Sequence, residues 1–76
     1  MKYLIKNENE IIIGATFEAL VEQLRNGSKF AGEEALPAYM KGFAERYEQS
    51  CGMKISIESP EAFILDLTKS EYLILQ

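Results

Sequence analysis

Apolar and polar residues near the start of the chain predict a β-hairpin over residues 2–14. A three-residue loop at 7–9 gives a self-consistent pairing, and Asn9 suits the left-handed backbone position that such a loop needs. The predicted register places Lys6 opposite Glu10, Ile5 opposite Ile11, Leu4 opposite Ile12, and Tyr3 opposite Ile13. We therefore assign the face with Tyr3, Ile5, Ile11 and Ile13 to the core.

Two helical patterns follow the hairpin. Thr16 is a good N-cap for the first, whose apolar stripe is Phe17, Leu20, Val21 and Leu24. The pair Asn26-Gly27 predicts a left-handed end to this helix. The second helix is expected from Pro37 to about residue 49, with Met40, Phe43, Ala44 and Tyr47 as its buried stripe.

Several details around the second helix are also predicted. Residues 33–35 can form a single turn, and Gly42 inside the helix indicates a close approach by another element. Tyr39 lies off the apolar stripe, and its ring is expected to cover the hairpin or a loop; a partly exposed contact residue is the alternative. Gly52 should end the helix, and Cys51 is expected to be a small buried residue just before that end.

The last third of the chain predicts a strand, a helix and a strand. Met53, Ile55 and Ile57 alternate with polar residues, as in a half-buried strand. A helix is predicted from the N-cap Ser59 to about residue 69, with a strand over 62–67 as the alternative. Residues 72–75 resemble a strand buried on both faces. The prediction is thus an α+β fold of order β-β-α-α-β-α-β, in which a three- or four-stranded sheet with an N-terminal antiparallel hairpin packs against two to three helices.

Composition adds few constraints. The chain has 76 residues, 47% of them hydrophobic, and a net charge of −4. That length predicts one small globular domain over residues 1–76. A lone cysteine forms no disulfide within the chain, and no apolar stretch is long enough for a signal peptide or membrane span. We therefore expect an acidic cytoplasmic protein that does not enter membranes.

No motif indicates catalysis. The sequence has no histidine, which removes Cys–His and Ser–His–Asp nucleophiles and histidine metal sites. Its glycines do not match a phosphate-binding loop, and its acids lack metal-ligand spacing. We expect no enzyme activity, no catalytic residue, no cofactor and no metal. A small carboxylate-dependent enzyme is the least favoured alternative.

A surplus of apolar strand residues indicates a contact surface. If all helices cover one side of the sheet, the other side exposes an apolar patch; if the third helix crosses over, the patch is buried within the monomer. The candidate interface comprises Leu4, Ile12, Tyr39, Arg46, Leu73 and Leu75, and the last strand offers Tyr72 and Ile74 as the alternative to Leu73 and Leu75. The leading hypothesis is a small interaction or regulatory module that binds a protein partner or a second copy of itself.

Nucleic-acid association is the alternative hypothesis. A weak binder would use Lys41, Arg46 and Tyr39, whereas an acidic mimic would occupy the site of such a binder. The scattered lysines and arginines, interleaved with acids, make a nucleic-acid partner the less favoured of the two.

Overall fold

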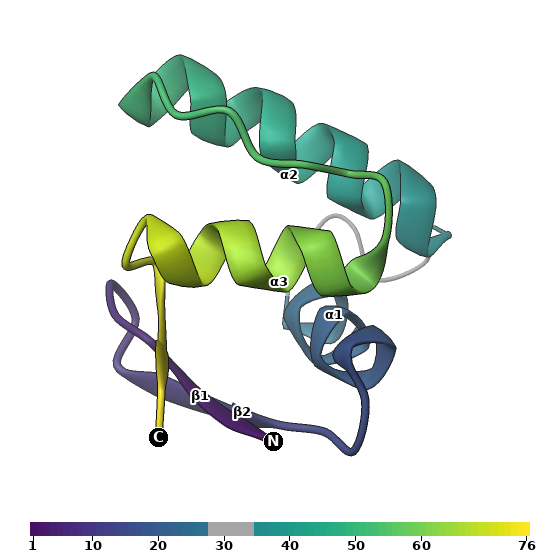
Figure 1. Ribbon diagram of the computed structural model, residues 1–76, viewed down its shortest axis with the longest axis vertical. Helices are drawn as coiled ribbons and strands as arrows, with labels where there is room; N and C mark the ends of the chain where they lie inside the picture. The colour runs from purple at the N-terminus through teal and green to yellow at the C-terminus, as the bar shows by residue number, and fades with distance from the viewer. Residues whose placement is uncertain (28–34) are drawn as a thin grey trace.

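The computed structural model describes residues 1–27 and 35–76 and has the predicted α+β fold (Figure 1). The N-terminal hairpin consists of β1 (Lys2–Ile5) and β2 (Glu10–Ile13). Three helices follow, and a strand closes the sheet: α1 (Phe17–Asn26), α2 (Leu36–Cys51), α3 (Pro60–Lys69) and β3 (Leu73–Leu75). The predicted turn at 33–35 lies largely outside the described residues.

The sheet has three antiparallel strands in the order β2-β1-β3, so β1 is central. The predicted hairpin register is wrong by one residue, because Tyr3 pairs with Ile12 and Leu4 pairs with Ile11. The loop therefore has four residues, 6–9, and the Asn9 N–H donates to the Ile5 carbonyl at 2.8 Å. Asn9 does take the left-handed conformation, with φ 53°. A shift of one residue exchanges the two faces of a strand.

This shift decides which isoleucine of β2 enters the core. Ile12 is buried with Tyr3 and Ile5, whereas Ile11 and Ile13 are exposed. The final strand also differs from prediction, since it is covered on one face only. Leu73 is buried, but Ile74 and Leu75 are exposed.

Helix α1 begins and ends where the sequence predicts. The Thr16 hydroxyl accepts a hydrogen bond from the Ala19 N–H at 3.1 Å, as an N-cap does. Gly27 follows the last residue, but its φ of −81° is right-handed, so the predicted left-handed end is wrong. The Gly27 N–H instead continues the helical pattern by donating to the Gln23 carbonyl at 3.1 Å.

Helix α2 is longer than predicted and turns a different side to the core. Its buried residues are Tyr39, Met40 and Ala44, while Phe43 and Tyr47 are half-buried against the core. Gly52 ends the helix in the left-handed conformation, with φ 73°. The close neighbour predicted for Gly42 comes from the same helix: an added Cβ would lie 3.1 Å from Arg46 Nη1.

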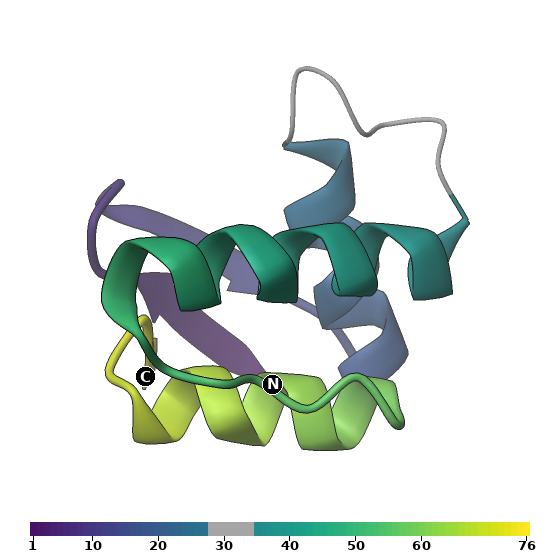
Figure 2. The same ribbon diagram turned by 90° about the horizontal axis from the view of Figure 1, so that it is seen from above.

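The predicted strand over 53–58 does not form. Residues 53–75 therefore contain one helix and one strand in place of the predicted strand, helix and strand. Both edges of the central strand already have partners, and residues 53–59 instead run back beside α2 and α3 (Figure 2). Ile55 is buried, which explains the alternating pattern. The Ser56 N–H donates to Asp66 Oδ2 on α3 at 2.8 Å, a side-chain acceptor in place of a neighbouring strand.

Helix α3 is helical as predicted, so the alternative strand over 62–67 is wrong. Its N-cap Ser59 accepts a hydrogen bond from the Ala62 N–H at 3.1 Å. Helices α3 and α1 pack against one side of the sheet, and α2 lies on their far side (Figure 1). The centre of the core consists of the fully buried side chains Leu20, Val21, Phe63, Ile64, Leu67 and Leu73.

Candidate functional site

The face of the sheet that points away from the helices is apolar and open. Cα pairing aligns Ile11, Leu4 and Ile74 in one row across the three strands, and Ile13 lies beside this row opposite Lys2. The exposed fractions are 43% for Ile11, 61% for Ile13 and 38% for Ile74. We call Leu4, Ile11, Ile13 and Ile74 the outer face.

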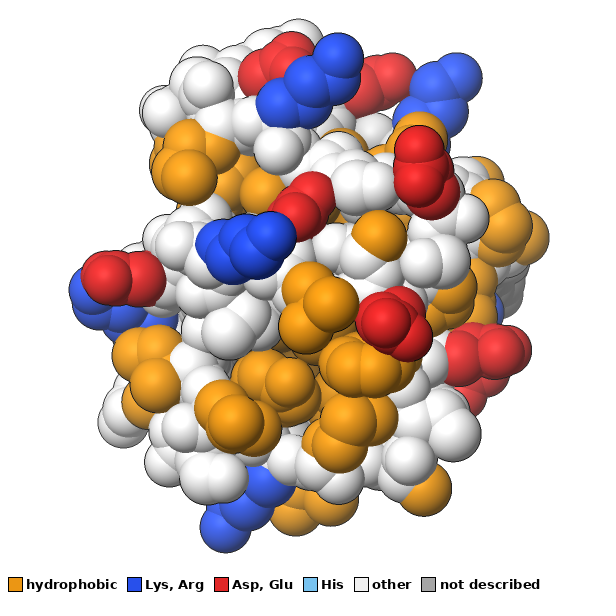
Figure 3. Space-filling model, in the orientation of Figure 1, with side chains coloured by type: hydrophobic (Ala, Val, Ile, Leu, Met, Phe, Trp, Pro, Cys, Tyr) orange, Lys and Arg blue, Asp and Glu red, His pale blue; other side chains and the backbone are white. Residues whose placement is uncertain are grey.

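The outer face exists because β2 carries three consecutive isoleucines. Whichever register the hairpin takes, an unbroken apolar run leaves at least one isoleucine on the side away from the core. Leu75 is 62% exposed but belongs to the opposite side of the sheet, because it pairs with the buried Tyr3. The view from the β3 side looks along the sheet and not onto the outer face; there, hydrophobic side chains gather beside α3 and the edge of the sheet (Figure 3).

The structure does not bring the six predicted interface residues together. Ile12, Tyr39 and Leu73 are buried at 4%, 4% and 0% exposure and offer no outer surface to a protein partner. Leu4 is on the outer face, whereas Leu75 is exposed on the opposite side of the sheet, where it pairs with Tyr3. Arg46 is exposed, but it belongs to α2, on the other side of the core.

These errors have two local causes. Because the register differs by one residue, Ile12 lies in the core, whereas Ile11 and Ile13, both predicted to be core residues, are exposed. A different rotation of α2 turned Tyr39 inward, which also removes it as a base-stacking residue. The residues missed were Ile11 and Ile13, while Ile74 belonged to the alternative pair on the last strand. A four-residue loop, which positions Asn9 equally well, was the signal that would have identified the two isoleucines of β2.

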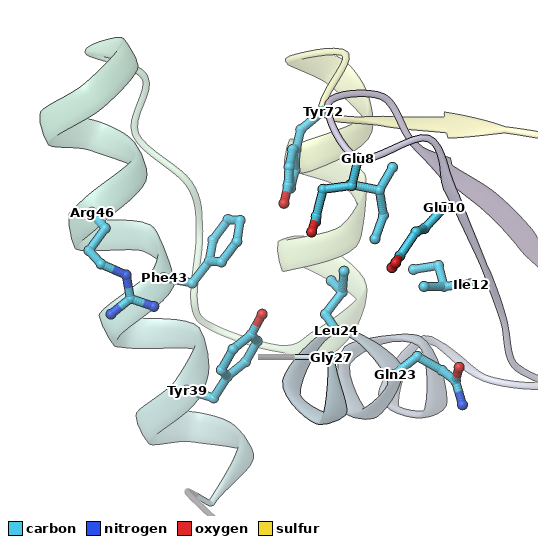
Figure 4. A pocket seen from close by; sticks show the side chains of 11 residues that line it. Glu8, Glu10, Ile12, Gln23, Leu24, Gly27, Tyr39, Phe43, Arg46 and Tyr72 are labelled. Carbon is cyan, nitrogen blue, oxygen red and sulfur yellow. The ribbon is translucent and has the colours of Figure 1, made fainter. Parts of the chain in front are cut away.

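A second candidate site is a cavity of about 260 Å³ between α2, the hairpin tip and the end of α1. Its walls include Tyr39, Phe43 and Arg46 of α2, together with Tyr72 just before β3. Glu8 and Glu10 come from the hairpin, and their carboxylates point into the space between the hairpin and α2 (Figure 4). We call this space the aromatic cavity.

Phe43 lies at the centre of a cluster of rings beside this cavity. Its ring centroid is 5.4 Å from that of Tyr72, 5.5 Å from Phe63, 5.9 Å from Tyr47 and 6.1 Å from Tyr39. Such separations are typical of stabilising aromatic pairs. The Tyr47 hydroxyl also donates to Ser70 Oγ at 3.1 Å. Aromatic contacts of this kind hold α2 against α3 and fix one wall of the cavity.

Charged side chains of opposite sign lie on different walls of the aromatic cavity. Glu8 and Glu10 lie on one wall and Arg46 on the other, and no ion pair joins them within the described chain. Burial raises the pKa of the Tyr72 hydroxyl above its ordinary value, and the nearby charge of Glu8 raises it further. The cavity thus has an acidic wall and a basic wall separated by aromatic rings.

The structure gives no support to a reactive thiol or a metal site among the described residues. Cys51 is the last residue of α2 and is exposed, so the predicted burial of its side chain is wrong. Over residues 1–27 and 35–76, no three cysteine, aspartate or glutamate side chains are grouped as metal ligands would be. Within the same residues, no helix has the length and apolar character that crossing a bilayer requires.

Comparisons of this chain with protein-family models, with curated proteins and with solved structures found no match. The function of this chain is therefore inferred from the geometry of the outer face and the aromatic cavity.

Proposed function

We propose that this protein is a small non-catalytic interaction module that self-associates by stacking the outer face of one copy on that of another. The observation that carries the proposal is the exposed apolar row Ile11–Leu4–Ile74, with Ile13 beside it. A contiguous apolar patch on a protein surface often marks a contact with another molecule.

A second copy suits this surface better than a partner of different chemistry. The middle of the outer face carries no charged side chain, and Lys2 lies at one end of it. A face of aliphatic side chains has no polar groups to select a charged or hydrogen-bonding partner, whereas it matches itself across a two-fold axis. The sheet-on-sheet arrangement buries such faces at a separation of about 10 Å.

The size of the outer face limits the strength of this contact. Strands of four, four and three residues, which rise about 3.3 Å per residue and lie about 4.8 Å apart, give a flat footprint of roughly 170 Å². The accessible surface is larger than the flat footprint because side chains protrude from the sheet. Even twice the footprint is well below the accessible surface of about 800 Å² that each partner buries in a stable complex. We therefore expect a reversible dimer that forms with increasing concentration, with a dissociation constant of about 0.1–1 mM.

Sedimentation equilibrium from about 10 μM to about 1 mM protein tests the proposal, since this range brackets the expected dissociation constant. Wild-type protein should show a mass that rises from monomer toward dimer. The variant Ile74→Lys places a charge at the end of the apolar row and should remain monomeric, because an unpaired charge cannot be buried cheaply at the contact.

Ile57→Lys is a matched control. Ile57 is 41% exposed, close to the 38% of Ile74, but it lies in the 53–59 segment. The control variant should associate like the wild type, although it carries the same added charge. A mass that stays monomeric at about 1 mM, or equal loss of association in both variants, would refute stacking through the outer face.

A further inference from the structure

The aromatic cavity has a combination of features that the outer face lacks: a concave volume, aromatic walls and charges of both signs. Its volume of about 260 Å³ approaches the lower limit of ordinary small-molecule sites. It is on the helix side of the sheet, so a ligand there would not compete with stacking of the outer face.

The two charged walls come from different elements. Glu8 and Glu10 belong to the hairpin, where the left-handed Asn9 fixes the turn between them. Arg46 lies on α2, one turn after Phe43, and its guanidinium runs along the helix, with Nη1 3.1 Å from the position of a Cβ added at Gly42. The like charges of Glu8 and Glu10 on one wall and the single cation at the edge of the other create a field across the cavity.

Aromatic side chains form the space between the charged walls. The hydroxyls of Tyr39 and Tyr72 point into this space from opposite sides, and the ring of Phe43 lies between them (Figure 4). Ring faces attract the flat or aliphatic body of a ligand, and they also attract cations. The hollow next to the cavity shares Phe43, Arg46 and Tyr72, so the site is open to solvent along α2.

We propose that the aromatic cavity binds a small zwitterionic ligand, with its ammonium group at Glu8 and Glu10, its carboxylate at Arg46 and its apolar body against Tyr39, Phe43 and Tyr72. The charges on both walls are exposed, so each contributes modestly in water. A dissociation constant of about 1 mM is therefore expected for a simple probe.

Three related para-substituted benzene probes test this assignment by NMR titration of the full chain. The first, 4-(aminomethyl)benzoate, carries both charges; 4-methylbenzylamine carries only the ammonium and 4-methylbenzoate only the carboxylate. The zwitterion should bind about threefold or more tightly than either singly charged probe, because it alone satisfies both walls. Shifted amide signals should map to the hairpin tip, α2 and Tyr72.

Charge-removing variants assign each end of the ligand. Glu8→Gln with Glu10→Gln should weaken the zwitterion and 4-methylbenzylamine but leave 4-methylbenzoate unchanged. Arg46→Gln should weaken the zwitterion and 4-methylbenzoate but leave 4-methylbenzylamine unchanged. All three residues are exposed, so these variants should keep the fold.

Matched controls remove equal charge elsewhere: Glu18→Gln with Glu58→Gln for the acids, and Lys54→Gln for the base. They should bind all probes like the wild type, since none of these residues lines the cavity. The proposal is overturned if 4-methylbenzylamine binds as tightly as the zwitterion, if Arg46→Gln has no effect, or if no probe shifts the cavity signals at about 10 mM.

Discussion

The two faces of the three-stranded sheet are similar in composition and opposite in environment. Tyr3, Ile5, Ile12 and Leu73 are all at most 5% exposed beneath the helices. The outer face carries aliphatic side chains of the same kind in water. Hydrophobicity alone therefore does not determine which face is covered. The register of the hairpin decides, because it aligns Ile12 with Tyr3 and sends Ile11 and Ile13 outward.

The largest expected effect is the difference in unfolding free energy between truncating a buried residue of β3 and truncating its neighbour on the outer face. Leu73 is fully buried, and its neighbour Ile74 is on the outer face. Leu73→Ala should lower the free energy of unfolding by about 3 kcal/mol, since it removes buried methyl groups and leaves a cavity. Ile74→Ala should cost less than about 1 kcal/mol. Urea denaturation of both variants at low protein concentration measures the difference, and similar costs would contradict the assigned faces.

A smaller effect tests the turn that keeps the faces in register. Asn9 has φ 53°, a conformation that β-branched side chains strongly disfavour. Asn9→Val should lower the free energy of unfolding by about 1–2 kcal/mol, while Asn9→Gly should be close to neutral. If valine is tolerated as well as glycine in urea denaturation, the four-residue loop is wrong.

The inner side also contains a titratable group whose effect appears only at alkaline pH. The pKa of Tyr72 is raised above its ordinary value of 10.0 in the folded state by burial and by Glu8. Its contribution to stability is therefore fully present below the unfolded pKa and is lost as pH rises through the folded pKa. Tyr72→Phe should make the alkaline loss of stability less steep, as measured by urea denaturation between pH 9 and 11.

Glu8→Gln gives a second measure of the same group. Without the nearby negative charge, the tyrosinate absorbance of Tyr72 should appear at lower pH than in the wild type. The expected shift is small, because burial is the larger cause. An unchanged titration in the Glu8→Gln variant would place the carboxylate too far from Tyr72 to act on it.

The smallest effect concerns the charged margin of the sheet. Lys6 Nζ lies 3.6 Å from Glu71 Oε2, and the two side chains are 56% and 76% exposed. A double-mutant cycle with Lys6→Gln and Glu71→Gln should give a coupling of at most about 0.3 kcal/mol, reduced further by salt. A coupling above about 1 kcal/mol would show that this pair, and not apolar burial alone, orders the sheet.

Features controlled by neighbouring residues could be predicted from the sequence. Thr16 and Ser59 cap their helices as expected, and Gly52 takes the left-handed conformation, because each depends on a few adjacent residues. The α+β fold also follows from these patterns, whereas they left open whether the second side of the sheet is exposed or covered by the third helix. The identity of the exposed residues did not follow, since three consecutive isoleucines give no alternation from which to read the register.

Features controlled by distant partners could not be predicted in the same way. Met53, Ile55 and Ile57 alternate as in a strand, but β1 had no free edge for them, and Ile55 is buried without pairing. The aromatic cavity is also non-local, because it combines the hairpin tip, α2 and Tyr72. Its acids and Arg46 have ordinary sequence surroundings, so only the folded arrangement identifies them as a group.

The central position of β1 has a consequence for synthesis on the ribosome. Its two neighbours are β2, which follows after four residues, and β3, at residues 73–75. A nascent chain that ends before β3 leaves one edge of β1 unpaired and Leu73 missing from the core. Completion of the domain must therefore wait until residue 75 has left the exit tunnel, and until then the open edge is exposed to other chains.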